Sequence, residues 1–128
     1  QGDGWVSYVV TSDGFARSLE KIRRFAAAHG RVLDGFTTAH LTFITLDRDR
    51  DRARQRWVSR LSARYAQDFG PLADRYGVIG TADECLEQIE RFRAAGCGYF
   101  LLNPICEPEE EGEQLEAIAS ELLPRLGT

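Results

Sequence analysis

The chain has 128 residues, of which 43% are hydrophobic, and a net charge of -4, so it is long enough for one domain with its own core. The negative charge argues against a general nucleic-acid binder, which needs a clustered positive surface, and no hydrophobic run is long enough to cross a bilayer. The three cysteines form no CxxC pair, which favours reduced thiols over a disulfide framework. No signal peptide is visible, so we expect a cytoplasmic protein. Because the sequence contains no methionine, we also expect that the chain has been cut or that its beginning lies elsewhere.

The first segments predict a strand followed by a helix. Residues 5–10 are rich in branched and aromatic side chains, which favours a short strand. Thr11 or Ser12 can cap the helix that follows, and Gly30 is expected to end it. The apolar stripe predicted for this helix comprises Phe15, Leu19, Ile22, Phe25 and Ala26.

A second strand and a second helix are predicted next. The strand covers Thr37–Leu46, and Asp47 is the expected N-cap of a long helix over residues 52–65. Gly70 and Pro71 are expected to break the chain before a possible third strand at residues 76–79. The buried stripe predicted for the long helix comprises Ala53, Trp57, Leu61 and Tyr65.

The clearest local pattern begins at Thr81, which forms a capping box with Glu84 at the start of a helix. Gly96 suits the left-handed position that ends such a helix. Residues 99–102 follow without polar alternation, which predicts a strand buried on both faces of a parallel sheet. A final amphipathic helix is expected over residues 110–123. Its predicted stripe comprises Leu115, Ile118, Ala119 and Leu122.

The predicted order is therefore β-α-β-α-β-α-β-α, without a linker or a low-complexity segment. Strands and helices that alternate in this way favour a parallel sheet with right-handed crossovers. An open doubly wound sheet and part of a (β/α)8 barrel both satisfy this pattern, and the pattern alone does not choose between them.

Two parts of the sequence resemble the later part of the luciferase-like monooxygenases. The first is GDGWVSYV followed by the helix FARSLEKIRRFAAAHGR, and the second is YGVIGTADECLEQIERFRAAGCGYFLLNPI followed by QLEAIASELLPRL. The resemblance implies a (β/α)8 (TIM-type) barrel that uses reduced flavin mononucleotide (FMN) or the deazaflavin F420 for monooxygenation or hydride transfer on a small-molecule substrate.

The length of the chain limits what this resemblance implies. A complete barrel needs about 250 residues, so residues 1–128 resemble a single C-terminal fragment, the last three to four βα units with parallel strands. The resemblance then implies an oxidoreductase fragment that is inactive in isolation and pairs with a missing N-terminal half. The alternative is a non-catalytic α/β module that self-associates or pairs with a separate N-terminal half, because unpaired strand edges and apolar faces attract other chains.

The residues expected to line the cofactor or substrate site are Ser7, Tyr8 and Asn103, none of them as the catalytic base. Ser7 and Tyr8 would lie near the rim of the barrel, and the alternative for both is packing within the core, which is favoured for Trp5. His40 can act as a base near neutral pH, but its place near the start of a strand favours a structural, hydrogen-bonded role.

Other motifs have simpler interpretations. Thr81 after Gly80 can bind a phosphate at the helix N-terminus, although an N-cap is the favoured interpretation. Residues 47–56 alternate arginine with aspartate, which predicts a salt-bridged helix start instead of a nucleic-acid site. The acidic run over residues 107–113 lacks the spacing of a calcium loop, so we expect no metal site. His29 is expected at the end of a helix, where its charge suits the helix dipole.

Overall fold

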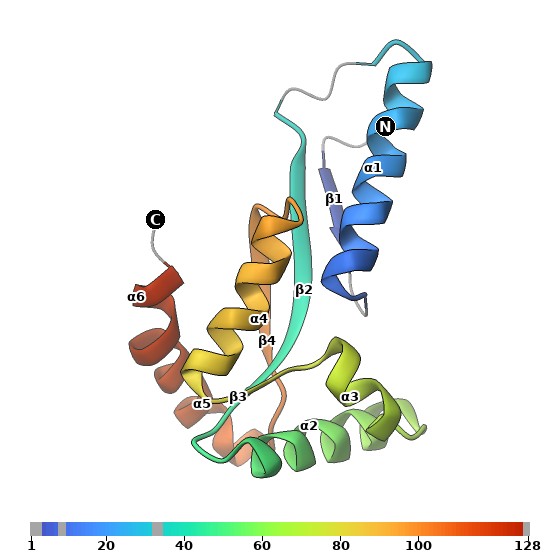
Figure 1. The fold of residues 1–128 in the computed structure, drawn as a ribbon. Coiled ribbons are helices and arrows are strands. Elements are labelled where there is room, and N and C mark those ends of the chain that lie inside the picture. The colour runs from blue at the N-terminus through green and yellow to red at the C-terminus, as the bar shows by residue number, and fades with distance from the viewer. Residues whose placement is uncertain (1–3, 8–9, 32–34, 127–128) are drawn as a thin grey trace.

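The fold is organised around one long strand that pairs with all the others (Figure 1). The computed structural model describes residues 4–7, 10–31 and 35–126. The strands are β1 (Gly4–Ser7), β2 (Thr37–Leu46), β3 (Val78–Gly80) and β4 (Tyr99–Pro104). The helices are α1 (Ser12–Ala28), α2 (Arg50–Tyr65), α3 (Gly70–Tyr76), α4 (Ala82–Ala94), the 3₁₀ turn η1 (Pro108–Glu110), α5 (Glu111–Ala117), the π-helical turn η2 (Ile118–Leu122) and α6 (Leu123–Leu126).

Every strand pairing in this four-stranded sheet is parallel, which confirms the parallel α/β prediction. β1 runs beside residues 37–40 of β2, and β3 runs beside residues 44–46. β4 pairs with residues 39–44 and so overlaps both. Since one edge of a strand accepts one partner at each residue, β4 must occupy the edge of β2 opposite to β1 and β3.

Both faces of β2 are covered near its carboxyl end. Phe43 packs against α2 and α3 together with Trp57 and Leu61. Ile44 and Leu46, which alternate with Phe43 along the strand, pack on the other face against α4 and the C-terminal helices. The core of the molecule therefore lies on both sides of this part of the sheet.

The amino end of the sheet is covered on one face only. There, Phe15 and Leu19 of α1 pack with Phe92 of α4. On the other face, Tyr99 and Leu101 of β4 are exposed. The prediction that residues 99–102 are buried on both faces is therefore wrong, because α2 covers only the carboxyl half of that face.

The helix starts follow local side-chain capping, with one correction. Thr11 caps α1 as expected, since its hydroxyl accepts a hydrogen bond from the Gly14 amide at 3.0 Å. The N-cap of α2 is Asp49, not Asp47, and its carboxylate accepts the Asp51 amide at 3.0 Å. Asp47 instead accepts the Asp49 amide at 2.9 Å, so it orders the turn that precedes the helix.

Two residues of the predicted stripes and one predicted chain break differ in the structure. Phe25 of α1 and Tyr65 of α2 are exposed, because the sheet does not extend beneath the ends of these helices. Gly70 and Pro71 begin the short helix α3 instead of breaking the chain, since proline is well tolerated in a first helical turn.

The C-terminal helix buries Ile118 and Leu122, as predicted, but it exposes Leu115 and Ala119 and buries Gln114 in their place. Gln114, Ile118 and Leu122 are buried, whereas Leu115 is 50% exposed. These buried residues are four apart in the sequence. The wider π-helical turn over Ile118–Leu122 keeps their side chains on one side of the helix. No described helix has both the length and the apolar character that a membrane span requires.

Candidate functional site

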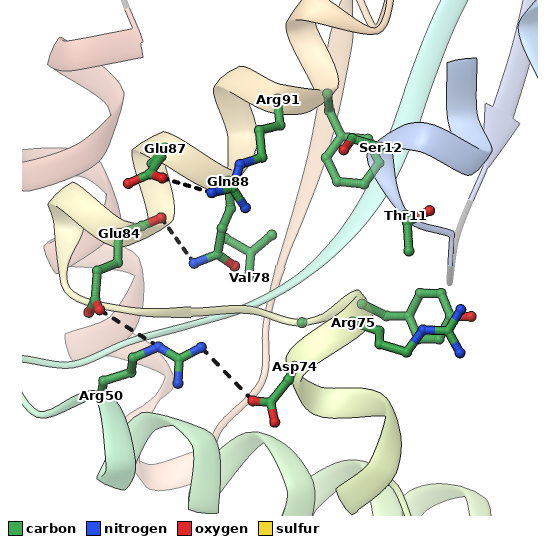
Figure 2. Close-up of a pocket in the computed structure, with 13 residues that line it drawn as sticks. Thr11, Ser12, Arg50, Asp74, Arg75, Val78, Glu84, Glu87, Gln88 and Arg91 are labelled. Atoms are coloured by element: carbon green, nitrogen blue, oxygen red, sulfur yellow. Dashed lines mark hydrogen bonds and ion pairs between the residues drawn. The ribbon is translucent and has the colours of Figure 1, made fainter. Parts of the chain in front are cut away.

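A polar cavity of about 460 Å³ lies between α1, α3 and α4, and we call it the helix cavity (Figure 2). Thr11 and Ser12 enter it from the start of α1, and Phe92 lines it from α4. The charged or amide-bearing side chains that line the cavity are Arg50, Asp74, Arg75, Glu84, Glu87, Gln88 and Arg91.

The carboxylates of the helix cavity are all paired with arginine. Arg50 lies 3.6 Å from Glu84 and 3.9 Å from Asp74, and so bridges α4 and α3 (Figure 2). Arg91 pairs with Glu87 at 2.7 Å within α4. Because opposite charges are matched in this way, the helix cavity presents paired charges and hydrogen-bonding groups.

Gln88 has a structural role at the edge of this cavity. Its Nε2 donates to the Ile79 carbonyl at 3.1 Å, and its Oε1 accepts the Ile79 amide at 3.3 Å. The Gly80 carbonyl accepts the Asp47 amide and so faces β2. Successive residues of a strand turn their backbone groups to opposite edges, so the amide and carbonyl of Ile79 face away from β2. The Gln88 amide therefore replaces a neighbouring strand at the outer edge of β3.

Behind the helix cavity, Ser7 and His40 form a buried hydrogen-bonded pair. The Ser7 Oγ lies 2.9 Å from His40 Nδ1, and the His40 ring stacks on Phe92 with a centroid separation of 4.1 Å. Phe92 lines the cavity, so its ring separates His40 from the cavity. Parallel pairing of β1 with β2 explains the contact, because Ser7 and His40 are register partners.

Burial changes the acid-base chemistry of His40. Loss of solvation lowers the pKa of His40 from 6.5 to about 4, and the hydrogen bond with Ser7 opposes this only in part. The imidazole is therefore neutral at pH 7, and its low basicity does not suit a general base that works near neutrality. The structure places His40 in the hydrogen-bonded, structural position that the sequence favoured.

A second cavity of about 390 Å³ lies where β2 and β3 end, and we call it the rim cavity. Asp47, the residue after β2, accepts hydrogen bonds from Arg52 at 3.0 Å and from Arg56 at 3.1 Å. The hydrogen bond from Arg52 is the main reason that the pKa of Asp47 lies below its ordinary value, and burial opposes it. The negative charge of Asp47 is thus balanced by these two arginines. Arg48 also lines the cavity.

A second wall of the rim cavity is the start of α4, and a third is formed by Glu113, Gln114, Ala117 and Glu121. The Thr81 amide donates to Glu84 Oε1 at 2.9 Å, and the Thr81 hydroxyl accepts the Glu84 amide at 3.3 Å, which confirms the predicted capping box. Gly80 precedes it with φ +126°, and a Cβ there would lie 2.5 Å from Glu84 Oε1. Only glycine therefore allows this tight approach of the capping carboxylate.

Of the residues predicted for the cofactor, the two that the structure describes, Ser7 and Asn103, are not brought together. Tyr8 lies outside the described residues. Ser7 is a register partner of His40, and Asn103 is a register partner of Phe43. Because His40 and Phe43 point to opposite faces of β2, Ser7 and Asn103 lie on opposite faces of the sheet. Asn103 is half-buried near the end of β4.

The remaining motifs have structural partners. The arginine-aspartate run forms ion pairs, as predicted, and includes Arg54 with Asp74 at 3.2 Å. The acidic run supplies Glu107 and Glu110, which pair with Arg60 and Arg56 of α2. Within residues 4–7, 10–31 and 35–126, no group of three or more histidine, cysteine or acidic residues is placed to hold a metal ion.

The three cysteines are free and buried. Loss of solvation raises the pKa of Cys85 to about 12 and that of Cys97 to about 11. Burial likewise raises the pKa of Cys106, which lies just after β4. All three are therefore thiols at neutral pH, without the thiolate character that a nucleophile needs.

Sequence analysis missed the two glutamines that complete the sheet. Besides Gln88, Gln114 of α5 donates to the Leu46 carbonyl at 2.6 Å and accepts the Leu46 amide at 3.0 Å. A glutamine inside an otherwise apolar stripe was the available signal, because a buried amide requires hydrogen-bond partners.

No protein-family model and no curated protein matches the chain. Solved structures do match. One is the coenzyme F420-dependent tetrahydromethanopterin reductase from Methanopyrus kandleri, with a TM-score of 0.73, 18% identity, and 98% of this chain aligned to 46% of that chain. A second is a riboflavin lyase with modified FMN and riboflavin, with a TM-score of 0.68, 19% identity, and 98% of this chain aligned to 38% of that chain. A third is a monooxygenase from Streptomyces bottropensis, with a TM-score of 0.68, 21% identity, and 97% of this chain aligned to 41% of that chain.

These matches concern the fold. They confirm, at the level of fold, the resemblance to luciferase-like proteins and the partial (β/α)8 barrel that this resemblance implies. The chain spans less than half the length of the structures it matches.

Proposed function

We propose that residues 1–128 are the C-terminal part of a luciferase-like oxidoreductase that uses reduced FMN or F420 on a small-molecule substrate. The observation that carries this proposal is the fold match, because almost all of this chain aligns to part of proteins named for F420 or found with modified FMN. The share of those chains that is covered supports a fragment that needs a complementary N-terminal half. The proposal places the protein in the cytoplasm, in line with its free cysteines.

The rim cavity offers one side, that of Arg48 and the start of α4, to the anionic part of such a cofactor, while Glu113 and Glu121 line another part of it. In parallel α/β folds and barrels, ligands bind at the carboxyl ends of the strands, where this cavity lies. Arg48 is an exposed cation there, and Ala82 contributes the first amide of α4, a group that favours anions. FMN and F420 both carry phosphate, so Arg48 and the start of α4 would hold that group.

The flat ring of the cofactor fits the described residues less well. Leu46, Ala82 and Ala117 are the apolar residues that line the rim cavity, and none of them offers an aromatic wall. When bound, the cofactor supplies the two-electron redox chemistry. The chain's own residues would hold its phosphate and shield one side, while residues of the complementary half would enclose the ring.

The three residues predicted for the cofactor have different roles in this proposal. Asn103 remains the best placed, since it lies half-buried near the carboxyl end of β4 and its amide can donate and accept. Ser7 would act through His40 by fixing the β1 strand instead of by direct contact. Tyr8 follows directly after Ser7 and is proposed to contribute its hydroxyl.

Binding and turnover measurements test this proposal. We expect the isolated chain to show no turnover with reduced FMN or with reduced F420, and to gain binding when a complementary N-terminal half from a luciferase-like protein is added. Arg48→Ala should weaken this binding by about tenfold, the loss of one charge-assisted contact. Arg23→Ala, which removes an exposed arginine from α1, is the matched control.

Two results would contradict the proposal. Turnover by the isolated chain would refute the need for a second half. Failure of the reconstituted pair to bind either cofactor, although the two halves associate, would refute the oxidoreductase assignment.

A non-catalytic α/β module is the second candidate. The observation that favours it is the exposed apolar face of β4, which marks an interface whether or not chemistry follows. Association without cofactor binding would support this candidate against the first.

A further inference from the structure

An uncovered apolar surface lies on the face of the sheet that α2 leaves open. Val6 is 56% exposed, Tyr99 63% and Leu101 51%. Val6 and Tyr99 are both register partners of Ala39, and Leu101 is the partner of Leu41. Register partners in a parallel pair point to the same face, so these side chains form one surface, which we call the sheet patch.

The sheet patch is unusual for the surface of this chain. The exposed large hydrophobic side chains among the described residues are Val6, Phe25, Tyr65, Tyr99, Leu101, Leu115 and Leu123. Three of these belong to the sheet patch, and none of the residues that form it carries a charge. Neighbouring apolar residues on one exposed face indicate an interaction surface, whereas scattered ones do not.

The strand edges beside the sheet patch are open as well. The Ile105 amide donates to the Ile44 carbonyl and so faces β2. Because backbone groups alternate between the two edges of a strand, those of Phe100 and Leu102 point away from β2. In the described part of the chain, β4 pairs with β2 alone, and so does β1. Open edges on both sides of an apolar face favour association with another sheet.

We infer that, when no N-terminal half is present, a second copy of this chain covers the sheet patch, with the two patches facing each other about a twofold axis. One copy corresponds to 46% of the length of the matched reductase, so two copies approach the size of one complete chain of that fold. Each copy provides a sheet of four parallel strands, and a complete barrel has eight. An uncharged apolar surface is also complementary to itself, which a twofold interface requires.

This inference rests on the proposed function in one respect, because the sheet patch is the surface that the N-terminal half would cover, and in the isolated chain a second copy takes its place. Its physical basis is separate. The net charge of -4 opposes association of two copies, and the sheet patch is a place where two copies meet without bringing like charges together. Burial of Tyr99 and Leu101 then supplies the hydrophobic free energy of association.

Sedimentation equilibrium of the purified 128-residue chain tests the inference. The expected mass is twice the 14.4 kDa of one chain. Leu101→Lys should lower the association constant by about a hundredfold or more, since it places two charges at the interface. Leu115→Lys is the matched control, because Leu115 is 50% exposed on α5 and lies outside the sheet patch.

Circular dichroism establishes that each variant is folded, and Tyr99→Lys replaces Leu101→Lys if that variant does not fold. A wild-type chain that sediments as a monomer overturns the inference, as does a dimer that both sheet-patch variants leave intact. A monomer that still binds FMN or F420 together with an N-terminal half overturns the dimer while leaving the proposed function standing.

Discussion

The buried Ser7–His40 pair makes the stability of this fold depend on pH in a calculable way. The pKa of His40 is about 4 in the folded chain, against 6.5 when the imidazole is solvated. The unfolded chain therefore binds a proton at a higher pH than the folded chain does. Because the folded pKa is depressed, stability is fully present above the unfolded pKa and falls as the pH falls from 6.5 toward 4.

The size of this effect follows from the two pKa values. Between about pH 7.5 and about pH 5, protonation of the unfolded chain should lower the free energy of unfolding by about 2 kcal/mol. The loss continues to about 3 kcal/mol near the folded pKa and then levels off, because each pKa unit corresponds to about 1.4 kcal/mol. Such a change is a large fraction of the stability of a small domain.

Urea unfolding at a series of pH values, compared between variants, measures this dependence. His40→Gln should remove the His40 contribution to the slope between about pH 7.5 and about pH 5, whereas His29→Gln should retain it. The chain has two histidines, so the variant without His29 also isolates the His40 signal for titration by nuclear magnetic resonance. A His40 resonance that titrates near 6.5 would refute the reasoning, as would equal slopes for the wild-type and His40→Gln chains.

Two further substitutions test the packing that completes the sheet. Gln114→Leu leaves the buried amide and carbonyl of Leu46 without partners and should lower the free energy of unfolding in urea by about 2–4 kcal/mol. The exposed Gln67→Leu is its control, and an equal loss in both would contradict the role of Gln114. Gly80→Ala forces a side chain into a left-handed position beside Glu84 and should lower the melting temperature, with a cost of about 1 kcal/mol or more. Gly112→Ala, which meets nothing within 4 Å, should leave it unchanged or raise it, and the opposite order would exclude strain at Gly80.

The elements that the sequence predicts best are those whose determinants lie within a few residues. The start of α4 is an example, since Thr81 and Glu84 satisfy each other's backbone amides without help from the rest of the fold. The N-cap of α2 was mistaken because Asp47 and Asp49 are equally suitable locally. Contact with Arg56, the seventh residue of the helix, selects the role of Asp47.

Burial depends on distant elements and is predicted less well. The run over Tyr99–Pro104 is apolar enough for a strand covered on both faces, but the reach of α2 decides which of its residues are covered. The C-terminal helix shows the same limit. An ordinary helical period selects Leu115, whereas the π-helical turn and the bonds of Gln114 to Leu46 place Gln114 in the core instead.

The candidate site shows the most general limit of sequence analysis. Alternation along a strand determines which of its residues share a face, but it does not determine how the faces of two strands correspond. That correspondence comes from the register, which pairs Ser7 with His40 and Asn103 with Phe43. Both residues lie near strand ends, as predicted, yet a shift of one residue in either register would have placed them on the same face. A cofactor contact predicted from position along a strand therefore becomes specific only when the strand pairing is known.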